Sequence, residues 1–440
     1  MTRVYVQTFG CQMNVADSNG LAHAAWSMGC SFVTDPAQAD IMLLNTCAIR
    51  EKAETRVYGR LGQLKTVKDG NPGAKLLVCG CLAEKDRAVM LRKAPWVDAL
   101  LGPRDYGRFK QVLSEWGVAS DEPPPDAVFS LPSAEDDPGE SAHAEFAHLR
   151  ALVNITRGCE KFCTYCIVPY TRGPLESIDP EVIEAQIQHE LRCGAREIML
   201  LGQNVNSYHD EATGLDFAGL LVRLGAIGGL DRLTFLTSHP KDFNRDVVDA
   251  LATLPNAAPR MHLPMQAGSD RVLAAMARLY TIEEYLEKVA YFRERLPGWA
   301  LTTDIIVGYP TETEADFLET LAVVERGTFE SAFIFAYSPR AGTPAATMSP
   351  QVPKEEKIRR LQAVNAAQND ATRRFHESFI GERVRVLAQG PSKKDPTRMA
   401  GKTGHNITVV YPLDDRTAHA PFADIVAEQA FNWGLAGRVA

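Results

Sequence analysis

The chain has 440 residues, a hydrophobic content of 45%, a formal net charge of −8 and nine cysteines. This length predicts roughly two or three domains, and the absence of an apolar run of about 18 residues argues against a membrane-spanning helix. The first residues, MTRVYVQTFG, lack the apolar segment of a signal peptide. We therefore expect a cytoplasmic protein without a membrane partner, in which clustered thiols are ligands or catalysts rather than disulfides.

Strands and helices alternate in the N-terminal part of the chain. Apolar runs at 4–10, 40–47 and 75–80 predict strands, and the segments that follow each run predict helices. Continuous apolar strands that alternate with helices indicate a parallel sheet covered on both faces. We predict an open, flavodoxin-like α/β domain over residues 1–114.

Three cysteines follow the ends of these predicted strands: Cys11, Cys47 and Cys81. Ligands of open α/β sheets bind at the carboxyl ends of the strands, so these cysteines would converge at one edge if the strands form as predicted. Cys79 and Cys81 could both point the same way, but Cys81 falls just beyond the strand, where the loop begins. The remaining cysteines are expected to be small buried hydrophobic residues: Cys30, Cys79 and Cys193.

Residues 115–146 contain nine Asp or Glu, five prolines and no Lys or Arg. Such a composition cannot bury enough apolar surface to fold alone, so the segment is predicted to be an acidic, proline-rich linker. Without it the chain is close to neutral, which keeps a nucleic-acid partner possible despite the overall negative charge.

After the linker the alternation of strands and helices resumes over a longer stretch. Six strand and helix units favour a partial (β/α)6 barrel over the closed eight-stranded one. The predicted strands are 152–156, 197–202, 233–237, 260–263, 301–308 and 332–337.

The loop after the first of these strands carries Cys159, Cys163 and Cys166 in a C-x3-C-x2-C spacing. A closed zinc site takes four ligands, yet residues 157–173 contain no fourth cysteine and no histidine. Three thiolates can hold a [4Fe-4S] cluster and leave one iron open to a substrate or cofactor. The spacing therefore favours an iron–sulfur cluster.

The C-terminal region begins with a long polar helix at 354–377, followed by short strand candidates that predict a small β-barrel over 378–440. Small barrels of this kind often bind single-stranded nucleic acid. The basic residues here either face RNA, which would make affinity fall steeply with salt, or form a solvated surface. They include Arg373, Arg374, Arg383, Arg385, Lys393, Lys394, Arg398 and Lys402.

The C-x3-C-x2-C motif with Tyr165 before its last cysteine resembles the radical S-adenosylmethionine (radical SAM) superfamily. Further motifs are similar to those of the methylthiotransferases within it: QTFGCQMN, NTCAIREKAE, VCGCLAEK, RGCEKFCTYCIVPYTRG, LLGQNVNSY, HLPMQAGS and YSPRAGTPAA. The CQMN and CAIREKAE segments resemble most the MiaB type, which acts on N(6)-dimethylallyladenosine in tRNA. The resemblance covers nearly the whole chain outside the linker.

This resemblance implies a radical SAM core at 147–377 and a C-terminal RNA-binding TRAM domain at 378–440. It implies that Cys159, Cys163 and Cys166 hold the cluster that binds S-adenosylmethionine. It also implies an auxiliary [4Fe-4S] cluster, held by Cys11, Cys47 and Cys81, that carries the transferable sulfur.

The reaction implied is transfer of a methylthio group to C2 of N(6)-dimethylallyladenosine at tRNA position 37, next to the anticodon. Two molecules of S-adenosylmethionine would be used per turnover, one for the methyl group and one for the radical that activates the C2–H bond. The implied partners are the tRNA anticodon stem-loop and an electron donor of the flavodoxin or ferredoxin type, and we expect a monomer.

Five further residues are candidates for the site. Tyr165, Gln203 and Asn204 are candidates for cofactor binding, and the alternative for the two amides is a capped turn. His239 and Asp304 are candidates for catalysis or polar contact. Their alternatives are a structural histidine before proline and a buried, hydrogen-bonded carboxylate.

Three rival functions remain open at this point. Two are sister methylthiotransferases that act on threonylcarbamoyladenosine in tRNA or on an aspartate of a ribosomal protein. The third is a non-catalytic RNA-binding protein with structural iron or zinc, although two cysteine sets that each lack a fourth ligand would make poor structural sites.

Overall fold

The computed structural model describes residues 1–48, 51–118 and 144–440, so most of the predicted linker lies outside the described residues. The chain divides into two compact units. The first unit takes 1–148, 157–160 and 167–175, and the second takes 149–156, 161–166 and 176–440. No helix in the described part of the chain is long and apolar enough to cross a membrane.

The first unit is built on a five-stranded parallel sheet with strand order β2-β1-β3-β4-β5. This is the strand order of flavodoxin-like folds, which confirms the predicted fold. Two of its strands were not predicted, because a run of three residues is too short to show a pattern. The strands are β1 (Arg3–Thr8), β2 (Ser31–Val33), β3 (Ile41–Thr46), β4 (Lys75–Gly80) and β5 (Ala99–Leu101).

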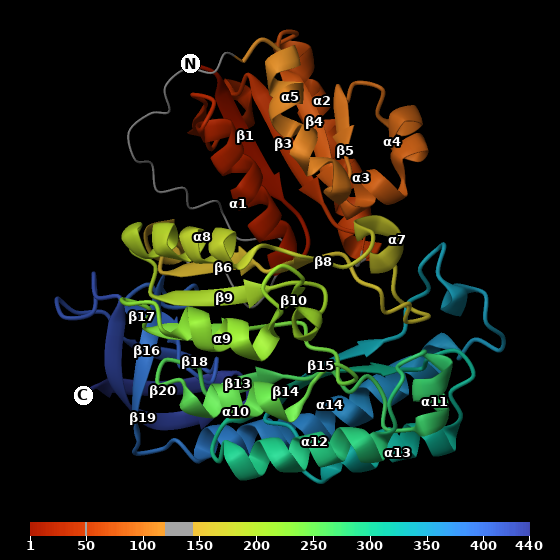
Figure 1. Cartoon of the computed structure of the whole chain (residues 1–440), viewed down its shortest axis with the longest axis vertical. Coiled ribbons are helices and arrows are strands. Elements are labelled where there is room, and N and C mark those ends of the chain that lie inside the picture. The colour runs from red at the N-terminus through yellow and green to blue at the C-terminus, as the bar shows by residue number, and fades with distance from the viewer. Residues whose placement is uncertain (49–50, 119–143) are drawn as a thin grey trace. The chain divides into compact units, whose positions relative to one another are not determined.

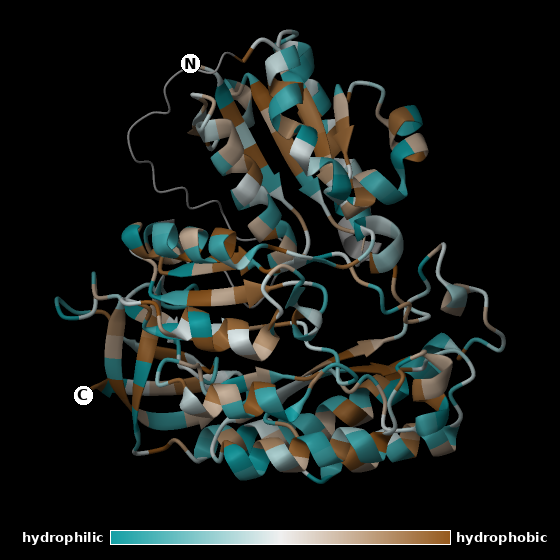
Figure 2. Cartoon of the chain, in the orientation of Figure 1, coloured by the Kyte–Doolittle hydropathy of each residue, from teal (hydrophilic) through white to brown (hydrophobic). Residues whose placement is uncertain are grey.

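Helices cover both faces of this sheet, and alternate strand residues pack against each (Figure 1). On β3, Met42 and Leu44 join the cluster that contains Leu61, while Leu43 joins the cluster that contains Leu21. Burial on both faces explains the continuous apolar runs, which Figure 2 shows in brown. The helices are α1 (Gln12–Trp26), α2 (Glu51–Gly70), α3 (Cys81–Lys85), α4 (Arg87–Lys93), α5 (Phe109–Glu115) and α7 (Val168–Arg172).

The second unit contains two three-stranded parallel sheets, ordered β12-β9-β6 and β13-β14-β15. A parallel bridge between Leu233 and Ala257 links them into a partial barrel, which confirms the predicted (β/α)6 architecture. The strands are β6 (Arg150–Asn154), β9 (Glu197–Leu201), β12 (Arg232–Phe235), β13 (Arg260–His262), β14 (Ala300–Val307) and β15 (Ser331–Ala336).

Helices pack on the outer side of these strands, and residues of the opposite side line the barrel lumen. Ile198 and Leu200 of β9 belong to the hydrophobic core with the helices, whereas Glu197 and Met199 alternate with them. The principal helices are α8 (Pro180–Arg192), α9 (Phe217–Gly225), α10 (Arg245–Thr253), α11 (Asp270–Ala275), α12 (Ile282–Arg295), α13 (Glu314–Glu325) and α14 (Lys354–Glu377).

The second unit ends in a closed five-stranded barrel of order β16-β17-β18-β20-β19, which confirms the predicted small β-barrel. Two of its strands, β17 and β20, escaped prediction because glycine and basic residues interrupt their alternation. The strands are β16 (Arg383–Pro391), β17 (Arg398–Lys402), β18 (Thr408–Pro412), β19 (Phe422–Phe431) and β20 (Gly434–Val439).

Candidate functional site

Three cysteines of the first unit lie at the carboxyl ends of neighbouring strands. Cys11 precedes the first residue of α1, Cys47 directly follows β3, and Cys81 is the first residue of α3 after β4. Because β1, β3 and β4 are adjacent and parallel, their ends bring the three thiols to one edge of the sheet.

The thiols interact with one another. A hydrogen bond with Cys47 lowers the pKa of the Cys11 thiol to about 6. Burial raises the pKa of Cys81, and the charge of Cys11 adds to this rise. Gly10 permits the close approach: it has a φ of +119°, and a Cβ there would lie 2.4 Å from the Cβ of Cys47.

Arg172 of α7 brings a positive charge to this thiol set. Its Nη2 donates to Asp17 Oδ2 over 2.8 Å and to Asn14 Oδ1 over 3.4 Å. Asn14 in turn donates to the carbonyl of Thr46 over 2.9 Å, next to Cys47. Thiolates crowded together need such compensation, so the donor set and the neighbouring cation fit an anionic iron–sulfur group.

Cys159, Cys163 and Cys166 all lie on the loop before α7; the first two are buried and the third is partly exposed. In the second unit, Arg278 Nη1 donates to Cys163 Sγ over 3.4 Å and to the Tyr165 hydroxyl over 3.4 Å. Tyr165 therefore helps to hold the arginine that contacts the thiol.

Arg278 is 4% exposed and is held by further hydrogen bonds. Its Nε donates to the Tyr280 hydroxyl over 3.1 Å and its Nη2 to the Pro264 carbonyl over 3.2 Å. Burial opposes its charge, but the neighbouring Tyr165, Tyr280 and Cys163 keep its pKa above the ordinary value. The thiol of Cys163 thus faces a permanent cation.

His239 follows β12 and places its Nε2 4.0 Å from Cys163 Sγ. The backbone N–H of Lys241 donates to His239 Nδ1 over 3.2 Å, so a neutral ring carries its proton on Nε2, toward the sulfur. Burial, assisted by the charge of Arg278, lowers the pKa of His239 to about 3. At neutral pH this residue is a hydrogen-bond donor to sulfur and not a cationic acid.

Polar atoms collect at the carboxyl ends of the first strands of the partial barrel. Within the described residues, Thr156 Oγ1, Gln203 Oε1 and Ser238 Oγ are buried without a hydrogen-bond partner. Asn204 Oδ1 is also buried without a hydrogen-bond partner, while its Nδ2 donates to Asp242 Oδ2 over 2.5 Å. These buried atoms are free to accept or donate a hydrogen bond to a polar ligand.

Asp304 lies on β14 with its side chain 29% exposed, and its Oδ2 is 3.5 Å from His262 Nε2. His262 Nδ1 lies 3.0 Å from Thr302 Oγ1. Asp304 is therefore a lumen residue and not a deeply buried carboxylate.

The amino ends of the strands are closed by a buried ion cluster around Glu197. The nearest nitrogens lie 2.8 Å away for Arg150, 2.9 Å for Arg232 and 3.4 Å for Arg260. This cluster fills the lumen opposite the cysteine loop, so the reactive end of the barrel is the carboxyl end.

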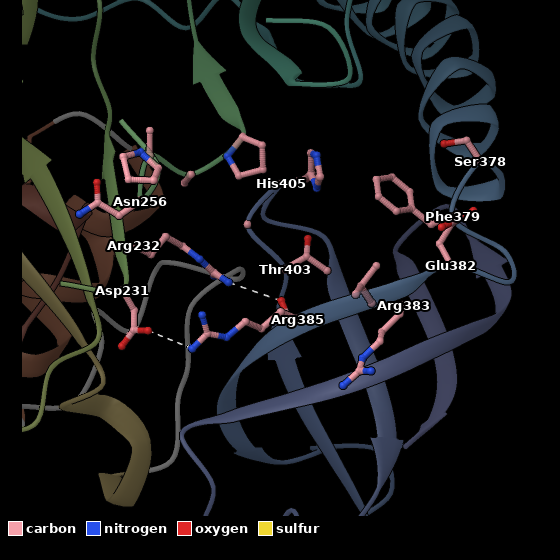
Figure 3. Close-up of a pocket in the computed structure, with 16 residues that line it drawn as sticks. Asp231, Arg232, Asn256, Ser378, Phe379, Glu382, Arg383, Arg385, Thr403 and His405 are labelled. Carbon is pink, nitrogen blue, oxygen red and sulfur yellow. Dashed lines mark hydrogen bonds and ion pairs between the residues drawn. The ribbon is translucent and has the colours of Figure 1, made fainter. Parts of the chain in front are cut away.

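Some basic residues of the C-terminal barrel are paired with carboxylates, and others are exposed on a loop. Arg385 Nη2 pairs with Asp231 over 2.9 Å beside a cavity of about 470 Å³ (Figure 3). Arg383 pairs with Asp424 over 2.7 Å. Lys393 and Lys394, in the loop between β16 and β17, are exposed.

Among residues 1–48, 51–118 and 144–440, no group of three or more His, Cys, Asp or Glu side chains is arranged to hold a single metal ion. A [4Fe-4S] cluster differs from a single ion because it spreads its ligands over separate iron atoms.

Comparison with known proteins shows which family the chain belongs to. The family "Uncharacterized protein family UPF0004" matches residues 3–102, and the "Radical SAM superfamily" matches residues 153–324. A tRNA-2-methylthio-N(6)-dimethylallyladenosine synthase of Moorella thermoacetica is 41% identical over 437 residues, which is 98% of this chain and 97% of that one. The chain belongs to the family of tRNA-2-methylthio-N(6)-dimethylallyladenosine synthases.

A second synthase of this name, from Thermobifida fusca, is 42% identical over 438 residues, or 98% of this chain and 87% of its own. The family consists of radical SAM enzymes that transfer sulfur, and it implies S-adenosylmethionine and a [4Fe-4S] cluster. A solved radical SAM methyltransferase, TsrM from Kitasatospora setae, has a TM-score of 0.58 at 12% identity and covers 79% of this chain and 77% of its own, which supports the fold.

The sequence analysis did not predict that Arg278 contacts Cys163, or that Arg172 places its charge beside the thiols of the first unit. Arg172 stands in the quoted motif RGCEKFCTYCIVPYTRG, where its charge so close to the cysteines was an available signal. Arg278 lies 112 residues after Cys166, and no motif marked it.

Proposed function

We propose that this chain converts N(6)-dimethylallyladenosine at tRNA position 37 into its 2-methylthio derivative. The observation that carries the proposal is the similarity to synthases of that name over nearly the full length of both chains. The two cysteine sets, at the carboxyl ends of strands in two parallel sheets, support it.

In this proposal Cys11, Cys47 and Cys81 hold an auxiliary [4Fe-4S] cluster. Their convergence at one sheet edge and the buried cation of Arg172 support the assignment. When bound, that group supplies an iron site for the sulfur that is transferred. Asn14 would orient the loop after β3 through its bond to the Thr46 carbonyl, and Arg172 would balance the charge of the thiolates.

Cys159, Cys163 and Cys166 hold the other cluster in this proposal. With that cluster and S-adenosylmethionine bound, the site supplies the one-electron chemistry needed at the unactivated C2–H bond. The partnerless buried atoms of Gln203 and Ser238 would take polar groups of S-adenosylmethionine.

We further propose the anticodon stem-loop as the part of tRNA that binds, a flavodoxin- or ferredoxin-type electron donor, and a monomeric enzyme. Residues 378–440 would form the RNA-binding domain, since a small closed barrel with exposed lysines suits that role. The radical SAM core would span residues 147–377, and the N-terminal domain would span residues 1–114.

The test is nucleoside mass spectrometry on tRNA from cells with the gene, without it, and complemented with a Cys163→Ala variant. Loss of the 2-methylthio group with accumulation of N(6)-dimethylallyladenosine, restored only by the wild-type gene, is expected. An unchanged profile of this base would contradict the proposal and would direct the search to threonylcarbamoyladenosine or to a ribosomal protein.

A further inference from the structure

Asp242 lies in the loop between β12 and α10, and its carboxylate accepts hydrogen bonds from two other loops. Its Oδ1 lies 2.8 Å from the Nζ of Lys161. Its Oδ2 accepts from Asn204 Nδ2 over 2.5 Å and from Ser207 Oγ over 2.8 Å. The three loops come after β6, β9 and β12, which are neighbours in one sheet. A single carboxylate thus joins the loops that follow three adjacent strands.

The residues 161–166, here called the cysteine segment, belong to the second unit and are held to it at two points. Near one end, Lys161 pairs with the carboxylate described above. Near the other end, the Thr164 hydroxyl donates to the carbonyl of Ala275 over 2.8 Å. Cys163 lies between these two points, so the ion pair of Lys161 helps to set the place of its thiol.

Asn204 and Ser207 belong to the loop after β9, where the short 3-10 helix η3 (Val205–Ser207) forms. Asn204 is 2% exposed. Its neighbour Gln203 has a buried Oε1 that lacks a hydrogen-bond partner among the described residues. The carboxylate of Asp242 therefore orients the loop that carries this unsatisfied amide.

The ion pair is partly buried and charged at neutral pH. Burial alone would raise the pKa of Asp242, but hydrogen bonds from Lys161, Ser207 and Asn204 keep this pKa below its ordinary value. The side chains of Asp242 and Lys161 are 20% and 24% exposed, so water and salt screen the pair less than a surface pair. The backbone N–H of Asp242 also donates to the His239 carbonyl over 3.0 Å, which ties the same turn to the histidine near the thiol.

We propose that Asp242 is a positioning residue for S-adenosylmethionine, because one carboxylate holds the cysteine segment in place against the loop that carries Gln203. This inference rests on the proposed function, in which Cys163 holds the cluster and Gln203 takes a polar group of S-adenosylmethionine. A ligand that binds at two places at once needs both places held in fixed relative positions. If the two loops move independently, binding must also order them, and the affinity falls.

The test measures the affinity of the reconstituted full-length protein for S-adenosylmethionine by equilibrium dialysis, in a double-mutant cycle. Lys161→Met should raise the dissociation constant about threefold, and Asp242→Ala about tenfold, because the second change also releases the loop after β9. The double variant should match Asp242→Ala, since the ion pair is already lost there. Lys161→Arg keeps the cation and should bind nearly as tightly as the wild type.

Asp249→Ala is the matched control, because Asp249 on α10 pairs with Arg295 over the same 2.8 Å but is 44% exposed. It should leave the dissociation constant unchanged. Thermal unfolding and iron content of each variant separate a loss of fold or of cluster from a loss of affinity. If Asp242→Ala does not fold, the comparison of Lys161→Met with Lys161→Arg decides by itself.

Two results would overturn the positioning role while a wild-type protein that binds S-adenosylmethionine still supports the proposed function. One is a double variant in which the two effects multiply, which would show that the side chains act independently. The other is a lower unfolding temperature with an unchanged dissociation constant, which would show a structural role alone. A wild-type protein that takes up no cluster or does not bind S-adenosylmethionine would overturn the proposed function and this inference together.

Discussion

Arg172 donates a 2.8 Å hydrogen bond to Asp17 although 155 residues separate them, and both side chains are only 6% exposed. The short helix after the C-x3-C-x2-C motif therefore belongs to the first unit, with its cation beside Cys11 and Cys81. A segment of about a dozen residues thus carries proposed ligands of the cluster that binds S-adenosylmethionine. The same segment carries Arg172, whose charge lies beside the proposed auxiliary cluster.

Removing this arginine should destabilise the protein strongly. In Arg172→Ala the buried Asp17 carboxylate loses its ion pair with the arginine, and breaking a buried ion pair typically costs about 3–5 kcal/mol. Denaturant unfolding measures the loss, and iron analysis should show weaker retention of the proposed auxiliary cluster. Arg3→Ala is the control, because its pair with Asp40 is exposed and should contribute little. An Arg172→Ala protein as stable as the control would refute the structural importance of the pair.

Iron content distinguishes Cys81 from Cys79 as a ligand. Cys81 begins α3 beyond the strand and interacts with Cys11, whereas Cys79 lies within β4, where burial raises its pKa well above the ordinary value. After anaerobic reconstitution, Cys81→Ala should hold about four fewer iron atoms per chain than the wild type, and Cys79→Ala should hold the full complement. The reverse pattern would show that Cys79 is the ligand.

His239 should tune the reduction potential of the cluster that we propose on Cys163. A donor to sulfur stabilises the more negative, reduced state, so His239→Ala should lower the midpoint potential. His239→Gln, which keeps an N–H donor, should lie closer to the wild type, and the exposed His209→Ala should have no effect. The measurement is a redox titration followed by electron paramagnetic resonance. Identical potentials in all variants would leave His239 with a structural role only.

The Glu197 cluster predicts a specific pH dependence of stability. Burial alone would raise its pKa, but Arg150, Arg260 and Arg232 lower it to about 2, from an ordinary 4.5. Because the folded pKa is the lower one, the contribution is complete above about pH 4.5 and is lost as the pH falls toward 2; it amounts to about 3 kcal/mol. Unfolding of wild type and Glu197→Gln should differ most at pH 7 and converge in acid. A difference independent of pH would contradict the assignment.

The exposed lysines of the C-terminal barrel should supply phosphate contacts. Replacing both Lys393 and Lys394 by alanine should weaken tRNA binding and reduce the slope of log affinity against log salt by about two. Arg383→Ala is the comparison, because Arg383 is already paired with Asp424. Fluorescence anisotropy at several salt concentrations measures both slopes. A double variant with an unchanged slope would place the RNA elsewhere.

Several elements could be predicted from the sequence because their signals are local. The long helix predicted at 354–377 has those bounds in the structure, and the six barrel strands lie within two residues of their predicted limits. The three-residue strands β2 and β5 were not predicted, because they form by pairing with β1 and β4 and their own residues show no strand pattern.

The sequence by itself determined the order of β/α units, the two cysteine sets and the family resemblance, since apolar periodicity and motif spacing are properties of neighbouring residues. Only the tertiary structure decided that Arg172 faces Asp17, that Arg278 and His239 face Cys163, and that Phe333 shares a face with Asp304. Each of these contacts depends on strand register or on loop closure between distant segments. Strand register and loop closure depend in turn on the packing of the whole chain, which no short segment encodes.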